Sequence, residues 1–241
     1  MGINVSNVSN KEAINLRYSA FLGMMYVSTT ESEAAIKAAK AEVGDAEVKK
    51  GYTGAKGDGS SAKALASLAA KGVKPVTLTG FLTSAQVIMR EHEGRSSPYL
   101  NVGIKDEDRF YLSVDLSNAA AQMLARKLVN ARVGELTELR LFATYDAKEG
   151  ADKAYANHGC TLKQGGAEVQ RVDPSEQLIP LKEEAKAKLA EAGVDDKETV
   201  GKRLSKVELD YHISLMDKVN AKFTAFYEER KQQQQQEKVP A

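Results

Sequence analysis

Hydrophobic and polar residues alternate along two neighbouring segments in the middle of the chain, residues 98–105 and 109–116. A period of two is typical of a strand that buries one face. A turn at residues 106–108 brings the apolar residues of both segments to one side, as burial requires. The pattern therefore predicts a β-hairpin in which the facing pairs are Ile104 with Phe110, Val102 with Leu112 and Leu100 with Val114.

The opposite face of this hairpin carries two aromatic rings and two cations, Tyr99, Lys105, Arg109 and Tyr111. Unpaired bases stack on aromatic rings, and lysine and arginine bind phosphates. This face is therefore a candidate surface for single-stranded nucleic acid. Exposed tyrosine and arginine are also ordinary strand residues, which is the plainer interpretation. Gly103, expected opposite Tyr111, either leaves room for a base over the ring or marks a bulge.

A long strand is expected before the hairpin, over residues 76–89. Its alternation changes phase near Gly80, which predicts a β-bulge there and places Phe81 on the same face as Val87. The connection from this strand to the hairpin holds Arg90 and Arg95, two candidate phosphate contacts.

A helix and a further strand are expected after the hairpin. Ser117 or Asn118 can cap the helix, which ends near Gly134. Its buried stripe consists of Ala120, Met123, Leu124, Leu128 and, as a weaker member, Val129. Residues 136–145 then alternate, with Arg140 and Phe142 on the polar face, so a cation and a ring again lie side by side.

The segment 146–157 is expected to be loose. Residues 159–172 predict a second hairpin around Gly165 and Gly166, a pair suited to a tight turn. In this hairpin Leu162 and Val169 face inward, and Lys163 faces outward as a further phosphate contact.

The N-terminal part gives fewer firm expectations. Residues 14–27 fit a helix and a strand equally well, and their type stays open. Residues 31–43 predict a solvated helix that ends at Gly44. The glycine- and serine-rich stretch 51–72 is expected to be a flexible connector or an exposed loop, since its spacing matches neither the Walker pattern nor the dinucleotide-binding fingerprint.

The C-terminal part predicts two helices, at residues 181–192 and from about 199 or 202 to 231, followed by a disordered glutamine-rich tail. The second helix has an apolar stripe that either packs on the sheet, pairs with Leu181 and Leu189, or joins a second subunit. The stripe consists of Leu204, Val207, Tyr211, Leu215, Val219, Phe223 and Phe226.

The amino-acid composition limits the classes of function that the protein can have. The 241 residues are 42% hydrophobic, and 34 basic against 33 acidic side chains give a net charge of +1, so nucleic-acid binding requires a local patch. The chain has one cysteine and no run of apolar residues long enough to span a membrane, which leads us to expect an intracellular, non-membrane protein.

His158 and Cys160 share a strand face, but no third group completes a catalytic set. We therefore expect no enzyme activity, metal or cofactor.

Together, these elements predict an α+β protein built on an OB-like five-stranded barrel (the oligonucleotide/oligosaccharide-binding fold) with C-terminal helices. The expected organisation is an N-terminal extension (1–72), a barrel core (73–175), a helical region (176–231) and a tail (232–241). A sandwich or an open antiparallel sheet fits nearly as well.

Two phrases in the predicted core resemble a known family: Val133-Gly-Glu-Leu-Thr-Glu-Leu-Arg-Leu-Phe-Ala-Thr-Tyr145 and Asn157-His-Gly-Cys-Thr-Leu-Lys-Gln-Gly-Gly166. They are similar to the barrel of bacteriophage single-stranded DNA-binding proteins, over residues 73–172. The resemblance implies sequence-tolerant binding of single-stranded DNA in phage replication or recombination, in the cytoplasm of the infected bacterium. The acidic tail common in that family is missing here, because the chain ends Glu-Lys-Val-Pro-Ala.

A second function class stays open. A phage structural or assembly protein would use the amphipathic 204–226 helix as its interaction surface, or as a means of self-association, and the sheet only as a core.

Overall fold

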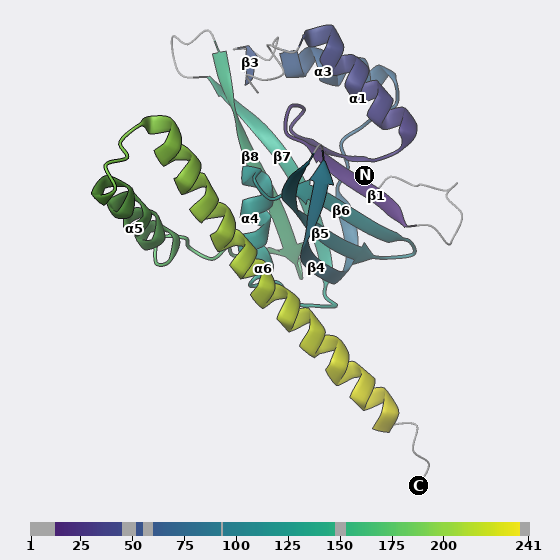
Figure 1. Cartoon of the computed structure of the whole chain (residues 1–241). Coiled ribbons are helices and arrows are strands. Elements are labelled where there is room, and N and C mark those ends of the chain that lie inside the picture. Colours follow the sequence, from purple (N-terminus) through teal and green to yellow (C-terminus); the bar gives the residue numbers. More distant parts are fainter. Residues whose placement is uncertain (1–12, 45–51, 55–59, 93, 148–152, 237–241) are drawn as a thin grey trace.

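The computed structural model describes residues 13–44, 52–54, 60–92, 94–147 and 153–236 (Figure 1). The strands are β1 (Ile14–Ser19), β2 (Met24–Val27), β3 (Tyr52–Gly54), β4 (Leu78–His92), β5 (Arg95–Lys105), β6 (Arg109–Asp115), β7 (Leu136–Ala147), β8 (Lys153–Gln164) and β9 (Ala167–Glu168). The helices are α1 (Thr30–Val43), α3 (Ser60–Ala70), α4 (Ala119–Leu128), α5 (Leu178–Glu191) and α6 (Lys197–Gln236). The expected α+β class with C-terminal helices is confirmed, although the sheet has more than five strands.

The sheet is a single hydrogen-bonded system that returns on itself. Its strands follow the order β2-β1-β6-β5-β4-β7-β8-β3, β9 pairs with β8, and β2 also pairs with β7 at Met24 and Phe142. Six strands therefore form a ring of hydrogen bonding, while β8, β3 and β9 continue outward from β7. The main apolar core is formed by the inward faces of these strands together with α4 and the middle of α6.

The central hairpin has the register that the sequence predicts. Ile104 pairs with Phe110, Val102 with Leu112 and Leu100 with Val114. All but Phe110 are buried, and Phe110 is partly buried against the same core. The apolar alternation thus fixed both the register and the buried face.

The bulge in β4 lies at Thr83, not at Gly80. The register of β4 against β5 shifts between Leu82 and Ser84, and Leu82 is buried whereas Phe81 is 49% exposed. The expectation that Phe81 shares a face with Val87 is therefore wrong, because Val87 packs against the core and Phe81 points away from it. Gly80 has a different role: a Cβ atom there would lie 2.8 Å from the carbonyl oxygen of Lys105, so only glycine fits.

The segment 14–27, whose type the sequence left open, forms two antiparallel strands. β1 runs parallel to β6, with Leu16 beside Leu112 and Arg17 beside Ser113. The hydroxyl of Tyr18 on β1 donates to the carbonyl oxygen of Phe142 on β7 at 3.1 Å. These two strands connect β6 to β7 and complete the ring.

Helix α4 and the strands after it follow the prediction with two changes. Asn118 caps α4 by accepting from the Ala120 amide, but α4 ends at Leu128, before Gly134. The expectation of a loose segment at residues 146–157 is wrong for residues 146–147, which belong to β7, and for residues 153–157, which belong to β8. Residues 154–157 pair with β7, and residues 148–152 lie outside the described residues. The second hairpin is confirmed: Gly165 and Gly166 both have positive φ angles between β8 and β9.

Two helices cover one end of the sheet in Figure 1. α1 ends at Gly44 as expected, and a capping box between Thr29 and Ser32 fixes its start. The connector prediction for residues 51–72 is wrong for residues 60–70, which form α3, and for residues 52–54, which form β3; its residues 51 and 55–59 lie outside the described residues. α1, α3 and β2 share a second apolar cluster that includes Phe21, Tyr26 and Leu68.

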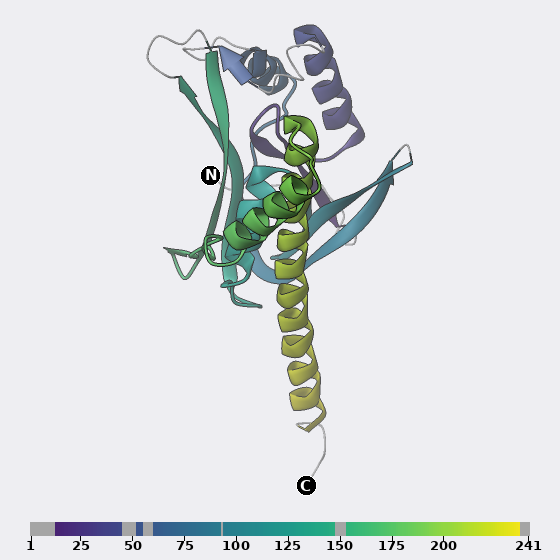
Figure 2. The same cartoon turned by 60° about the vertical axis from the view of Figure 1, so that its left-hand side comes forward.

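The long helix α6 crosses the sheet and continues beyond it (Figures 1 and 2). Tyr211, Leu215, Val219 and Phe223 are buried against β4, α4 and α5, so the expected packing of the stripe within the chain is confirmed. Residues 232–236 are helical, which contradicts the expected disorder of the glutamine run. Of the helices in the described part of the chain, none has the length and apolar character that a membrane crossing requires.

Candidate nucleic-acid interface

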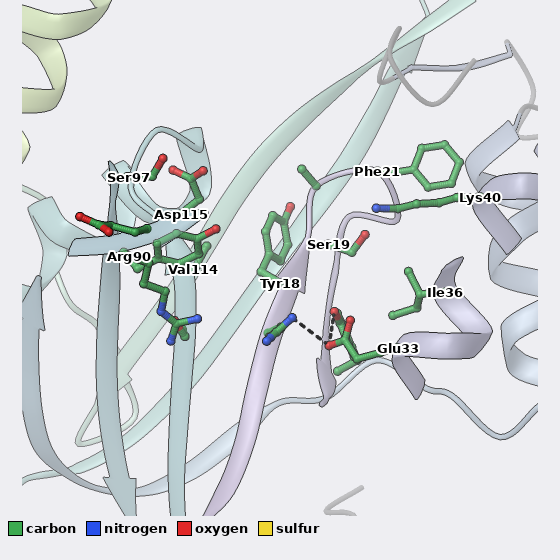
Figure 3. A pocket seen from close by; sticks show the side chains of 16 residues that line it. Tyr18, Ser19, Phe21, Glu33, Ile36, Lys40, Arg90, Ser97, Val114 and Asp115 are labelled. Carbon is green, nitrogen blue, oxygen red and sulfur yellow. Dashed lines mark hydrogen bonds and ion pairs between the residues drawn. The ribbon is translucent and has the colours of Figure 1, made fainter. Parts of the chain in front are cut away.

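The outer face of the central hairpin forms one wall of a cavity of about 620 Å³. In Figure 3, Arg90 and Asp115 lie on one side of this cavity, Glu33 and Lys40 of α1 lie on the other, and Tyr18 lies between them. The lining includes three basic side chains (Arg17, Lys40 and Arg90) and three acidic ones (Glu33, Glu91 and Asp115). Its charges therefore balance.

A smaller cavity of about 290 Å³ adjoins the larger one and shares Arg17, Arg90 and Ser113 with it. Its other lining residues are polar or aromatic, except for Leu16. They are Asn15, Leu16, Ser28, Asn101 and Tyr111. No carboxylate of the described residues lines this smaller cavity, so its two arginines favour an anion.

Strand pairing explains why these side chains meet. Arg17 of β1 lies beside Ser113 of β6, Ser113 lies opposite Asn101 of β5, and Asn15 lies beside Tyr111. All five point outward, because their neighbours along each strand are buried or partly buried. The parallel pairing of β1 with β6 therefore adds an arginine to the hairpin's polar face.

One face of the Tyr99 ring is covered by another side chain. The guanidinium carbon of Arg90 lies 4.7 Å from the centroid of the Tyr99 ring, which is a cation–π contact. Tyr111 is 41% exposed. One of the two hairpin tyrosines is thus accessible, and the other is paired with a cation that can also bind phosphate.

Arg17 is held by a carboxylate of α1. Its Nη1 atom lies 3.4 Å from Glu33 Oε1, which also accepts from the Tyr26 hydroxyl at 3.1 Å and from Ser28 Oγ at 2.8 Å. Burial and the neighbouring carboxylate raise the pKa of Tyr26. Half of the Arg17 side chain is exposed, so a phosphate can compete with Glu33 for it.

The predicted site residues of β4, β5 and β6 fall into three groups. Tyr99, Tyr111 and Arg90 share the cavities described above. Lys105 and Arg109 face each other next to the turn between β5 and β6. Arg95 lies at the far end of the β4–β5 hairpin, opposite residue 92, and is exposed.

The space over Gly103 is filled. Gly103 pairs with Tyr111 as expected, but a Cβ atom there would lie 2.3 Å from Ser84 Oγ and 3.0 Å from Thr83 Oγ1. The bulged residues of β4 therefore occupy the position that a base over this glycine would take.

Arg140, Phe142 and Lys163 lie apart from the two cavities. β4 pairs with β7 only over residues 78–81, the end of β4 away from Arg90, and Phe142 pairs with Met24 of β2. Arg140 lies over the Phe142 ring at 5.7 Å, and the same ring packs on Gly159. Lys163 lies 3.3 Å from Glu138. These residues form a second polar surface rather than an extension of the first.

His158 and Cys160 are directed inward on β8. The Tyr18 hydroxyl lies 2.7 Å from His158 Nδ1. Burial lowers the pKa of His158 and raises the pKa of Cys160 to about 12. The thiol is therefore protonated at neutral pH and is not activated as a nucleophile.

Sequence reasoning missed Arg17, Asn101 and Ser113. The alternation of the predicted hairpin places Asn101 and Ser113 on its polar face. However, neither side chain has a charge or an aromatic ring that would mark it as a binding residue. Arg17 lies in the segment whose type was open, so its face could not be assigned.

Comparisons of the chain with protein-family models, with curated proteins and with solved structures gave no match.

Proposed function

We propose that the protein binds single-stranded DNA through the outer face of β5 and β6, without catalysis. The observation that carries this proposal is the convergence of Tyr99, Tyr111, Arg90 and Arg17 on adjoining cavities. Rings that stack bases and cations that neutralise phosphates are the two components of sequence-tolerant single-strand binding.

Strand order supports the proposal. The strands β4, β5 and β6 form a meander, α4 follows, β7 returns to pair with β4, and β8 pairs with β7. A five-stranded sheet with a helix before its fourth strand is the arrangement of the OB-fold, which binds oligonucleotides on its second and third strands. In this chain those strands are β5 and β6. On this interpretation, β1 and β2 are additions that widen the ring.

The resemblance to phage single-stranded DNA-binding proteins points to the same role, in replication or recombination in an infected bacterial cell. The competing role, a phage structural or assembly protein, needs a free helix face. The stripe on α6 that would supply this face is largely buried within the chain, which favours the DNA-binding role.

Titration of labelled oligo-dT, followed by fluorescence anisotropy at several salt concentrations, tests the proposal. We expect binding that weakens as salt rises. A Tyr99→Ala, Tyr111→Ala double variant should lose affinity while keeping its circular dichroism spectrum, and Tyr227→Ala, an exposed tyrosine of α6, is the matched control. Absence of binding at low salt would refute the proposal, and unchanged affinity of the double variant would remove this face from it.

A further inference from the structure

Two residues that line the smaller cavity each carry an unsatisfied polar atom. Asn101 Oδ1 and Ser113 Oγ are shielded from solvent and have no hydrogen-bond partner among the described residues. Both side chains line the cavity, and the two residues face each other on β5 and β6. A buried polar group without a partner costs free energy, so a ligand that bonds to these atoms recovers that cost.

The walls of the cavity suit a flat aromatic ligand with a phosphate. Tyr111 supplies a ring, and Arg17 and Arg90 supply guanidinium groups, on which bases also stack. A volume of about 290 Å³ admits one small molecular group rather than a length of chain.

Amide and hydroxyl groups can distinguish bases by the hydrogen bonds that they form with base edges. An asparagine side chain carries both donors and an acceptor, a serine hydroxyl donates and accepts, and base edges present the complementary groups. Once the two side chains rotate toward the cavity, a base that stacks on Tyr111 with its edge toward β5 and β6 can form hydrogen bonds with Asn101 and Ser113. The negative charge of the attached phosphate then lies within reach of the two arginines.

We propose that the smaller cavity is a subsite for one unpaired nucleobase, and that Asn101 and Ser113 make binding depend on which base occupies it. This inference rests on the proposed single-stranded DNA binding. It adds a base-reading position to a surface that otherwise stacks bases without regard to their identity.

The test compares labelled homopolymers of dT, dC and dA, each about twelve nucleotides long, a length that one such site covers. The affinity ratios of the wild-type protein for these oligonucleotides should exceed about threefold for at least one pair. In Asn101→Ala and in Ser113→Ala, that ratio should fall toward the ratio set by stacking alone. The affinity for the weakest homopolymer should change less than about twofold.

Gln86→Ala is the matched control. Gln86 lies opposite Asn101 on β4, is exposed, and does not line either cavity, so its removal should leave the ratios unchanged. A thermal melt gives a second readout. Because Asn101→Ala removes an unsatisfied buried atom, the free protein should melt at the same or a higher temperature, whereas a purely structural role for Asn101 predicts a lower one.

The outcomes separate the two proposals. Binding of all homopolymers with ratios that Asn101→Ala and Ser113→Ala leave unchanged overturns the base subsite and retains DNA binding. A lower melting temperature of Asn101→Ala together with unchanged ratios has the same meaning. Failure to bind any homopolymer at low salt overturns both.

Discussion

The guanidinium carbon of Arg90 lies 4.7 Å from the centre of the Tyr99 ring, so this tyrosine is covered by a cation in the free protein. If the protein binds DNA as proposed, Arg90 has one of two roles. Arg90 can leave the ring to bind a phosphate, or it can stay and block the ring from a base.

Salt dependence of binding distinguishes these two roles. If Arg90 binds phosphate, Arg90→Gln should lower the slope of log affinity against log salt by about 0.7, the contribution of one phosphate in a single strand. The slope is measured by anisotropy titrations at four or more salt concentrations. An unchanged slope with a higher affinity would instead identify Arg90 as a shield over Tyr99.

A matched control exists on α6. Arg230 lies 5.2 Å from the Phe226 ring in the same kind of contact, and it does not line the two cavities. Arg230→Gln should leave the slope unchanged. A change equal to that of Arg90→Gln would mean that the effect reflects net charge alone.

Gly80 is required by a close approach of two strands. A Cβ atom there would lie 2.8 Å from both Ile104 Cγ2 and the Lys105 carbonyl oxygen, and the latter cannot move without shifting the backbone of β5. Gly80→Ala should lower the free energy of unfolding by about 1–3 kcal/mol in urea denaturation. Gly201→Ala, on a helical position of α6 with open space, should raise it by up to about 1 kcal/mol. Equal stability of the two variants would contradict this account.

Lys222 holds α6 to the end of α4. Its Nζ atom donates to the carbonyl oxygens of Leu128 at 3.2 Å, Val129 at 2.8 Å and Ala131 at 2.6 Å. Lys222→Met keeps the chain length but removes all three hydrogen bonds, although the Leu128 oxygen still accepts from the Ala131 amide at 3.3 Å. The free energy of unfolding should fall by about 1–3 kcal/mol.

The exposed Lys218, one turn earlier on α6, is the control for this substitution. Lys218→Met should change the free energy of unfolding by no more than about 0.5 kcal/mol. Both variants are compared by chemical denaturation, and a similar loss in each would show that the contacts of Lys222 are not needed for stability.

Stability should fall in mild acid because of His212. Burial lowers its pKa, while nearby Arg126 and Lys182 add to this effect and Glu208 opposes it. The unfolded chain takes up a proton near pH 6.5, whereas the folded chain does so only at lower pH. The folded state therefore loses stability as pH falls below about 6.5, by at most about 1.4 kcal/mol per pH unit for this group.

Denaturation at pH 7.5, 6.5 and 5.5 measures this loss, and His212→Gln should reduce it. His158, whose pKa burial also lowers, accounts for a remaining part, which His158→Gln should remove. If His212→Gln has the same pH dependence as the wild-type protein, then His212 is not the group that titrates.

The elements that depend on a local pattern were predicted better than those that depend on partners far away in the sequence. The β5–β6 register follows from alternation that starts and ends within eighteen residues or so, because a slip by one position would expose every apolar side chain. The α4 stripe follows from its spacing in the same way. Residues 14–27 could not be assigned, because their strand partners, such as Phe110 and Phe142, are far away in the sequence.

The errors have physical reasons. Small residues in 60–70 resemble a linker in composition, yet Ala64 and Leu68 are buried against α1. The glutamine run continues α6 because glutamine is a good helix former and a formed helix extends at little cost. The cavity that holds Asn101 and Ser113 needs β1 as a wall, so no single segment could have revealed it.

The closure of the sheet into a ring also determines the order in which the strands can pair while the chain is being synthesised. Ile14 and Met24 leave the ribosome early, but their partners Phe110 and Phe142 are made much later. The meander of β4, β5 and β6 needs only contacts close in sequence, whereas joining β1 to β6 requires closure of a long loop. β1 and β2 can pair with each other at once, but they must wait for β6 and β7, their other partners in the sheet, until the middle of the chain has been made.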